Sequence, residues 1–313
     1  MPVGTTTGKL IIVAGPTASG KSALALELAR RFDGTIINAD SMQVYRDLRV
    51  LTARPDDAAL AAAPHRLDGI LDGAELCSAA RWAALAHDEI AAAHRAGRLP
   101  IVVGGTGLYI RTLLSGIAPV PEIPEDIREA ARARHRAIGG EAFRAELAAL
   151  DPDAAQRLPA GDSQRLVRAY EVVRATGRTL GDWQREAAAS VPRYRSRQFV
   201  LLPPREALYA ACDGRFRAMI AAGALDEVAR LVARHLPPEL PIMKAVGVPE
   251  LARHLAGALD LEATIAAAQQ ATRNYAKRQF TWFRRQLADA EILDTQLSHS
   301  LVASVCQKIC DWT

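Results

Sequence analysis

Short apolar runs alternate with amphipathic segments along the first hundred residues of the chain. The runs at 10–14, 35–38 and 99–103 are apolar and partly β-branched, and helical patterns such as 22–31 separate them. Continuous apolar runs of this length are typical of strands that are buried on both faces of a parallel sheet. The pattern therefore predicts an α/β fold built on a doubly wound parallel sheet.

The pattern changes after residue 118. A proline-rich stretch at 119–124 interrupts regular structure, and the following residues up to 189 predict several amphipathic helices, with caps at Asp151 and Asp162. One more strand is predicted at 199–202, and helices follow it. We therefore expect three parts: a flexible N-terminus at 1–8, an α/β core formed by 9–118 and 199–313, and an all-helical insertion at 119–198.

The residues between the first apolar run and the first helix have the form of a P-loop. Glycines let backbone N–H groups face phosphates, the lysine reaches terminal phosphates, and the hydroxyl of Ser22 can hold Mg²⁺. The N-terminus of the following helix adds partial positive charge. The chain is expected to bind a di- or triphosphate, which could be transferred, hydrolysed or lost as a leaving group. The predicted phosphate-binding residues are Gly15, Pro16, Thr17, Ala18, Ser19, Gly20, Lys21 and Ser22.

Two further loops follow predicted strands, at 39–45 and 104–109. Open α/β sheets bind ligands at the carboxyl ends of their strands, so Asp40 and Thr106 should face the phosphate site. Asp40 fits a turn or helix cap, a Mg²⁺-holding carboxylate or a general base. Thr106 fits a turn residue or a ligand contact.

Composition narrows the class of protein. The 313 residues are 50% hydrophobic and carry a net charge of +4, and the pI near 9.0 mildly favours a polyanionic partner. No apolar run approaches the roughly 20 residues of a membrane helix. Residues 1–8 lack the features of a signal peptide. We expect a cytoplasmic protein with no membrane partner.

Basic residues gather in two places. The segment 273–285 holds five of them and no acidic residue, and aromatic residues are interleaved with them. Helical spacing puts cations on one face of this segment and apolar side chains on another. In the second region, arginines recur every four residues from Arg128 to Arg136. Either region fits a solvated helix face or a surface that binds nucleic acid.

Five motifs in this order resemble the bacterial tRNA dimethylallyltransferases, and the similarity covers nearly the whole chain. The resemblance implies transfer of a dimethylallyl group from its diphosphate to N6 of the adenosine 3′-adjacent to the anticodon, in tRNAs that read codons beginning with U. The P-loop would then hold the diphosphate instead of serving ATP hydrolysis. The motifs are the P-loop, Asp40-Ser41-Met42-Gln43-Val44-Tyr45, Gly104-Gly105-Thr106-Gly107-Leu108-Tyr109, Asp162-Ser163-Gln164-Arg165-Leu166-Val167-Arg168-Ala169-Tyr170-Glu171-Val172 and Ala276-Lys277-Arg278-Gln279-Phe280-Thr281-Trp282-Phe283-Arg284.

The resemblance also implies roles for individual residues. Asp40 would be the catalytic base, with Thr106 and Arg215 near the diphosphate and Mg²⁺ held by Ser22. The partners would be dimethylallyl diphosphate and the anticodon stem-loop of tRNA. Separately, we expect the protein to be a monomer. The positions that would contact tRNA are Asp40, Ser41, Met42, Gln43, Thr106, Arg128, Gln164, Arg165, Leu166, Val167, Arg168, Lys277, Arg278, Gln279, Trp282 and Arg284.

The chain departs from the family pattern at a few positions outside the catalytic set. Leu51 and Arg54 stand where the family commonly has glycine and lysine, Arg66 replaces a more usual histidine, and Val248 stands where tyrosine is common. These changes affect local contacts to tRNA instead of the reaction.

Other functions fit parts of the sequence. In a small-molecule or nucleotide kinase, Asp40 would hold Mg²⁺ and ATP would be the phosphoryl donor. A non-catalytic RNA-binding module could carry a vestigial P-loop, although Lys21 and Asp40 are intact. Prenylation of free adenine nucleotides would leave the helical insertion without a function.

Overall fold

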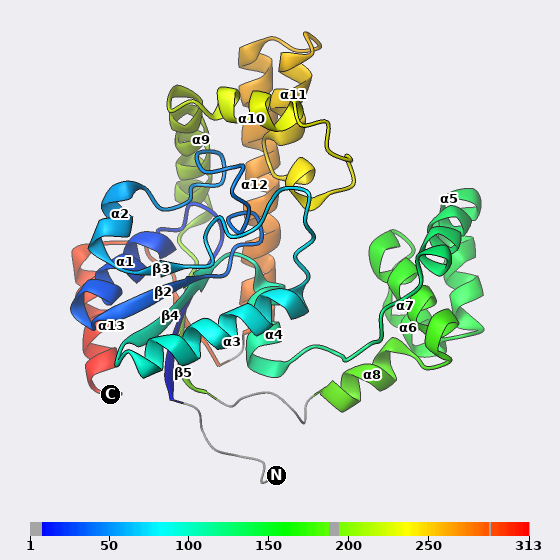
Figure 1. Cartoon of the computed structure of the whole chain (residues 1–313), viewed down its shortest axis with the longest axis horizontal. Helices are drawn as coiled ribbons and strands as arrows, with labels where there is room; N and C mark the ends of the chain where they lie inside the picture. The colour runs from blue at the N-terminus through cyan, green and yellow to red at the C-terminus, as the bar shows by residue number, and fades with distance from the viewer. Residues whose placement is uncertain (1–7, 188–193, 288, 313) are drawn as a thin grey trace. The chain divides into compact units, whose positions relative to one another are not determined.

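The computed structural model describes residues 8–187, 194–287 and 289–312. The chain divides into two compact units, one formed by Met1–Leu113 together with Pro192–Thr313 and the other by Leu114–Val191 (Figure 1). Apart from Gly8, the N-terminal segment that was expected to be flexible lies outside the described residues.

A parallel sheet forms the centre of the first unit. In the described residues it has six strands in the order β3-β2-β4-β1-β5-β6, and every pairing is parallel. This confirms the predicted α/β fold. The strands are β1 (Lys9–Ala14), β2 (Gly34–Asn38), β3 (His65–Arg66), β4 (Leu99–Gly104), β5 (Arg195–Leu201) and β6 (Glu291–Leu293).

Strand β5 begins earlier than the sequence pattern predicted. Its first four residues are mostly polar and pair with β1 through the backbone, in a register that sets Lys9 beside Arg195 and Ile12 beside Gln198. Because backbone pairing needs no apolar side chains, the hydrophobic pattern revealed only the second half of the strand. The predicted boundary between 198 and 199 therefore falls inside β5.

Helices cover both faces of the sheet. On one face, Ile11 and Val13 of β1 pack with Leu24 of α1 and Val305 of α13. On the other, Trp82 of α3 donates its indole N–H to the carbonyl of Asn38 at 2.9 Å. Figure 1 shows α1 and α13 together beside the sheet. The helices of this unit are α1 (Lys21–Arg31), α2 (Asp57–Ala62), α3 (Ala79–Arg95), α4 (Gly107–Ser115), α9 (Arg205–Ala221), α10 (Ala224–Val232), the 3₁₀ turn η1 (Pro241–Lys244), α11 (Val248–Leu255), α12 (Leu261–Gln286) and α13 (His299–Cys310).

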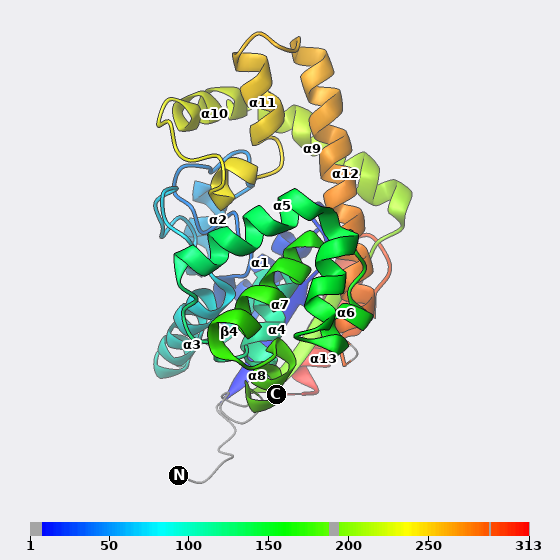
Figure 2. The ribbon, with the colours of Figure 1, turned by 90° about the vertical axis from the view of Figure 1, so that its right-hand side faces the viewer.

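The second unit is helical and has its own core. It contains α5 (Glu125–Ala148), α6 (Pro152–Arg157), α7 (Ser163–Thr176) and α8 (Leu180–Ala187), of which α5, α6 and α7 lie side by side (Figure 2). Both predicted caps are confirmed, because Asp151 and Asp162 accept hydrogen bonds from the first turns of α6 and α7. Phe143, Leu147 and Leu166 are fully buried between these helices.

None of the helices in the described part of the chain combines the length and the apolarity needed to cross a bilayer.

Candidate active site

Asp40 and Thr106 lie on neighbouring loops at the carboxyl ends of β2 and β4. The N–H of Thr106 donates to the carbonyl of Ala39 at 3.2 Å, and the Thr106 hydroxyl accepts from the N–H of Ser41 at 2.9 Å. One carboxylate oxygen of Asp40 accepts from the N–H of Met42 at 2.9 Å, which fixes the side chain in a turn. The structure thus brings together the two loops whose proximity the sequence predicted.

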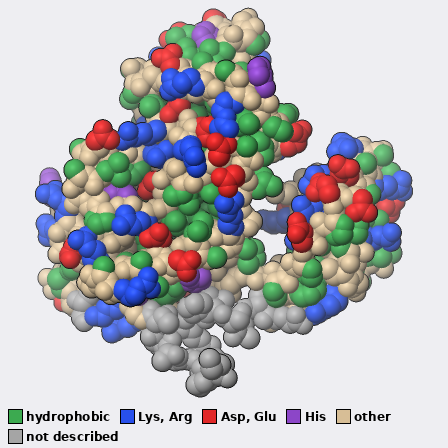
Figure 3. Space-filling model, viewed as in Figure 1, with side chains coloured by type: hydrophobic (Ala, Val, Ile, Leu, Met, Phe, Trp, Pro, Cys, Tyr) green, Lys and Arg blue, Asp and Glu red, His purple; other side chains and the backbone are tan. Residues whose placement is uncertain are grey.

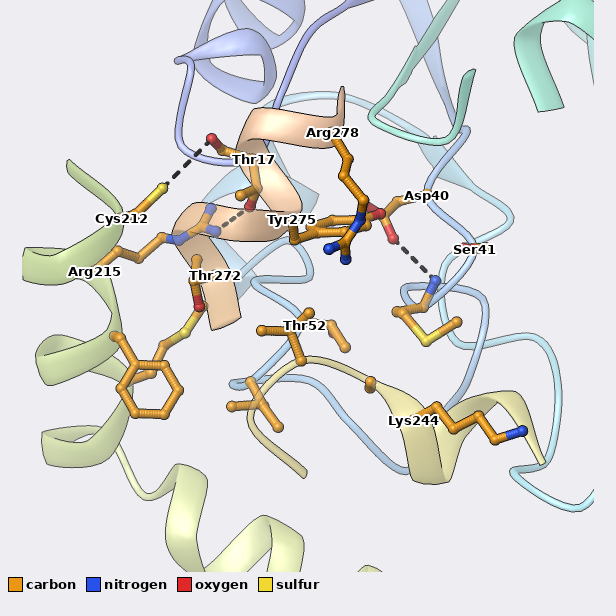
Figure 4. A pocket seen from close by; sticks show the side chains of 16 residues that line it. Thr17, Asp40, Ser41, Thr52, Cys212, Arg215, Lys244, Thr272, Tyr275 and Arg278 are labelled. Atoms are coloured by element: carbon orange, nitrogen blue, oxygen red, sulfur yellow. Dashed lines mark hydrogen bonds between the residues drawn. The ribbon is translucent and has the colours of Figure 1, made fainter. Parts of the chain in front are cut away.

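A cavity of about 240 Å³ opens beside these loops, and Figure 4 shows it from close by. Arg215 points toward Thr17 of the P-loop, while Tyr275 and Arg278 lie next to Asp40 (Figure 4). Cations and hydroxyls therefore surround one part of the cavity, and apolar side chains surround the rest. The lining residues are Thr17, Asp40, Ser41, Met42, Leu51, Thr52, Cys212, Arg215, Phe216, Met219, Lys244, Ala245, Val246, Thr272, Tyr275 and Arg278.

Two cations are held at the P-loop. Arg215 donates a hydrogen bond to the hydroxyl of Thr17, and the ammonium of Lys21 donates to the carbonyl of Pro16 at 3.2 Å. Burial lowers the pKa of Lys21 to about 8, although the charge of Asp40 raises it. Burial also lowers the pKa of Arg215. Since both cations lack much of their hydration, the site favours an anion that can neutralise them.

The amide of Gln279 joins the P-loop to the third loop. It accepts from the N–H of Thr17 at 2.8 Å and donates to the carbonyl of Gly105 at 2.8 Å. A Cβ on Gly105 would lie 2.3 Å from the Gln279 nitrogen, so a larger residue there would displace this amide from its bonds. Gln279, one of the positions that the family resemblance assigned to tRNA contact, is 6% exposed. The side chain satisfies two buried backbone groups.

Leu166 and Trp282, two further positions assigned to tRNA contact, are buried and partly buried respectively. Leu166 has no exposed surface and belongs to the core of the helical unit, where Val167 packs against the same cluster. Both side chains therefore stabilise the helical unit, and of the two only Val167, which is partly buried, has surface left for a contact. Trp282 is partly buried, and a Cβ on Gly107 would lie 2.3 Å from its ring, so the ring packs closely against the start of α4.

The remaining basic positions lie at the surface. Lys277, Arg278 and Arg284 are exposed on α12, and Gln164 and Arg165 are exposed on α7. In Figure 3, cations and carboxylates are mixed on the face shown. Several arginines of the helical unit are ion-paired: Arg128 with Glu125 at 3.4 Å, Arg165 with Asp162 at 3.3 Å and Arg168 with Glu171 at 3.7 Å. The first two pairs are partly exposed and contribute only about 0–1 kcal/mol, so phosphates can replace their carboxylates. Glu171 of the third pair is buried.

Ser22 lines a different cavity from Asp40. It is exposed in the first turn of α1 and faces a space of about 520 Å³ that Asn38, Gln43 and Asp68 also line. Burial raises the pKa of Asp68 to about 7. The described residues contain no group of three or more His, Cys, Asp or Glu side chains arranged for a metal ion. A hydroxyl with few carboxylates fits Mg²⁺ that is bound mainly through ligand phosphates.

Sequence reasoning missed Tyr275 as a lining residue of the cavity. Burial raises the pKa of its hydroxyl, and the charge of Asp40 raises it further. Its position four residues before Gln279 puts both side chains on one face of α12, a signal that the sequence contained. Cys212 was also missed; its thiol lies 3.9 Å from the carbonyl of Thr17.

A parallel sheet whose first strand ends in a P-loop, with cations and a carboxylate around one cavity, defines a P-loop protein built to bind a phosphorylated ligand. Comparison with known families specifies it further. The model of the IPP transferase family matches residues 43–286, and that of the isopentenyl transferase family matches residues 8–67. The chain belongs to the IPP transferase family.

Relatives agree with this assignment. The chain is 60% identical over 289 residues to a tRNA dimethylallyltransferase of Rhodospirillum centenum, covering 92% of each chain, and 57% identical over 302 residues to that of Rhodospirillum rubrum, covering 95% of this chain and 92% of the relative. Among solved structures, the tRNA isopentenylpyrophosphate transferase of Bacillus halodurans matches with a TM-score of 0.70 at 31% identity, covering 97% of this chain and 96% of the other. A eukaryotic dimethylallyltransferase acting on tRNA matches with a TM-score of 0.83 at 28% identity, and the match covers 97% of this chain and 78% of the other.

Proposed function

We propose that this protein is a tRNA dimethylallyltransferase, which moves a dimethylallyl group from dimethylallyl diphosphate to N6 of the adenosine 3′-adjacent to the anticodon. The observation that carries the proposal is that the carboxylate of Asp40 lines the same cavity as Arg215 and the P-loop residue Thr17. A base and an anion site therefore lie on either side of one space. The allylic carbon can lie in this space, between the leaving diphosphate and the attacking amine.

The donor half of the reaction uses the P-loop. When the bond between the allylic carbon and the diphosphate oxygen breaks, the electron pair leaves with the oxygen, and negative charge builds on the diphosphate. Lys21, Arg215 and the N-terminus of α1 stabilise that charge in place, without reorganising during the reaction. Mg²⁺ bound to the diphosphate, with Ser22 as its protein ligand, would neutralise further charge.

The acceptor half uses Asp40 and Thr106. The lone pair of N6 forms the new bond to the allylic carbon, and the N6 proton must leave. The carboxylate of Asp40 accepts this proton, a contribution of about 10² to 10⁴ in rate. Thr106 holds the loop that carries Asp40 through its hydrogen bond with Ser41 and can contact the amine or the diphosphate.

The tRNA is held by the basic side chains. An adenosine in an anticodon loop must leave its stack to reach a cavity, at a cost of a few kcal/mol. Contacts to the phosphate backbone offset this cost. The exposed cations of α12 supply some of these contacts, and Arg128, Arg165 and Arg168 of the helical unit supply others. We further propose that the protein acts as a monomer.

Mass spectrometry of nucleosides tests the proposal. Unmodified tRNA is incubated with the protein, Mg²⁺ and dimethylallyl diphosphate and then digested, and N6-dimethylallyladenosine is expected at the position next to the anticodon. AMP competes poorly in the same reaction if an anticodon stem-loop is the true acceptor. Release of ADP from ATP with a small-molecule acceptor, without any prenylated nucleoside, would instead identify a kinase.

A further inference from the structure

A buried carboxylate that the reaction does not use lies on α10. Glu227 is 5% exposed, and its two oxygens accept hydrogen bonds from three consecutive backbone N–H groups. These belong to Arg49, to Val50 at 3.0 Å and to Leu51 at 2.9 Å. A buried charge is tolerated only where such bonds satisfy it, and bonds to a charged acceptor are the strong ones.

The three N–H groups belong to a compact turn formed by residues 48–54, which we name the strap. Within it, the N–H of Ala53 donates to the carbonyl of Val50 at 3.0 Å, and the hydroxyl of Thr52 donates to the carbonyl of Leu48 at 2.7 Å. The strap has no strand or helix of its own. Its position is therefore set by its contacts with neighbouring elements. Among these, the bonds to Glu227 hold its backbone, and an exposed ion pair between Arg49 and Asp57 of α2 at 2.5 Å holds a side chain.

The strap forms part of the cavity wall. The side chains of Leu51 and Thr52 line the cavity that Asp40 and Arg215 also line. Gln43 donates to the carbonyl of Thr52 at 2.8 Å and so ties the strap to the loop after β2. Displacement of the strap would change the cavity wall first and the loop of Asp40 second.

Leu51 belongs to the apolar part of that wall. A Cβ built on Gly247 would lie 2.9 Å from Leu51 Cδ1 and 3.1 Å from Phe216 Cε2, so these two side chains converge on one point. Phe216 and Met219 follow Arg215 along the same stretch of α9, and four residues of helix span about 6 Å. The cavity thus passes from cationic to apolar along α9, which is the polarity of a prenyl diphosphate.

We propose that Glu227 is a positioning residue for the prenyl donor: its carboxylate holds the strap so that Leu51 closes the apolar part of the cavity around the prenyl chain. The inference rests on the proposed function. It assigns to a residue outside the cavity, on α10, control over how tightly the donor is held and which prenyl chain is accepted.

Steady-state kinetics of Glu227→Ala and Glu227→Gln test the proposal. The alanine variant should raise the KM for dimethylallyl diphosphate about tenfold while the KM for tRNA changes less than about twofold, because only the donor wall has lost its support. The glutamine variant keeps one accepting oxygen but turns an N–H group toward the backbone donors, so a smaller rise of about threefold is expected. A loosened wall should also raise the ratio of kcat/KM for geranyl over dimethylallyl diphosphate about tenfold.

Asp260→Ala is the matched control. Asp260 caps α12 by accepting from the N–H of Ala263 at 2.7 Å, and its loss destabilises the same unit without contacting the strap. This variant should lower the thermal midpoint and leave the donor KM and the donor ratio unchanged. If Glu227→Ala does not fold, the donor KM and the donor ratio of Glu227→Gln alone test the proposal.

Three results are distinguishable. A donor KM and a donor ratio that stay at wild-type values in both Glu227 variants would reduce the residue to a structural one and overturn the proposal. A rise confined to the KM for tRNA would overturn it as well. A wild-type protein that transfers no prenyl group would overturn the proposed function itself.

Discussion

The side-chain oxygen of Gln279 lies 2.8 Å from the backbone nitrogen of Thr17 and accepts its hydrogen bond. The two residues are 262 positions apart in the sequence. Helix α12 therefore sets the conformation of the P-loop, although both belong to the first unit. This bond makes α12 a part of the phosphate site as well as a basic surface.

Gln279→Ala removes both bonds of this amide. It leaves the N–H of Thr17 and the carbonyl of Gly105 without their partner, at a cost of about 1–3 kcal/mol for each buried group that stays unsatisfied. We expect a lower thermal midpoint and weaker binding of dimethylallyl diphosphate in calorimetry. Gln270→Ala, at an exposed position of the same helix, serves as the control and should change neither quantity.

Asp40→Asn keeps the size of the side chain and an oxygen that can accept from Met42, but removes the base. Transfer should fall by about 10² to 10⁴, while filter binding of tRNA stays near the wild-type value. Lys21→Ala should reduce the rate at least as much, because stabilisation of the leaving group contributes several kcal/mol. Equal loss of tRNA binding and of rate in Asp40→Asn would contradict the role of Asp40 as the base.

The pKa of Lys21, which burial lowers to about 8, predicts a pH dependence. Below pH 8 the ammonium is charged and attracts the diphosphate; as the pH rises through 8 the charge is lost. Since the charged form stabilises the leaving diphosphate, the value of kcat/KM for the donor should decline above pH 8, by about thirtyfold at pH 9.5, in step with the charged fraction of Lys21. In Lys21→Arg, whose guanidinium stays charged, the profile should be flat over this range. A wild-type profile as flat as that of the arginine variant would contradict the assignment.

The same burial makes Lys21 costly to the folded protein without ligand. At pH 7 the charged form is disfavoured in the folded state, because its pKa is lower there than in the unfolded chain. Lys21→Met should raise the thermal midpoint of the free protein by about 2–4 °C for each kcal/mol gained, and abolish the further rise that the donor causes. Lys308→Met, which removes a partly exposed ion pair with Glu291, should give no gain. A lowered midpoint in Lys21→Met would show that the ammonium stabilises the fold.

Two adjacent residues of α7 have different environments: Arg165 lies at the surface of the helical unit and Leu166 in its core. Arg165→Glu should raise the KM for tRNA about tenfold, lower the salt dependence of tRNA binding and leave the donor KM unchanged. Leu166→Ala should instead destabilise the unit by about 2–5 kcal/mol, because it empties a fully buried position. Arg144→Glu, at a partly exposed site outside the predicted contacts, is the control. Identical tRNA binding by the wild type and Arg165→Glu would remove α7 from the interface.

Much of the catalytic unit could be predicted because local chemistry determines it. Strands buried on both faces are continuous apolar runs, and a P-loop has fixed glycine and lysine positions. The edge strands β3 and β6 escaped prediction because they contain only two and three residues. The first half of β5 escaped because its pairing depends on the backbone of β1.

The roles of individual site residues could be predicted less well than the fold. Gln279 and Leu166 were assigned to tRNA contact because they lie within motifs, but a motif does not distinguish the side chain that faces a ligand from the one that holds the motif in place. Glu227 gave no local signal, since its partners are backbone N–H groups about 177 residues away. Long-range bonds of a side chain to the backbone depend on tertiary structure, which a single sequence does not reveal.

The packing of α13 against α1 has a consequence for how the protein is made. Val305 and Ile309, near the very end of the chain, share one apolar cluster with Leu24 and Ile11, near its beginning. A nascent chain on the ribosome can assemble the helical unit once α7 has emerged, since that unit's core draws only on its own residues. The sheet behind the P-loop cannot close its core until α13 is synthesised, so this unit completes its folding after the helical unit.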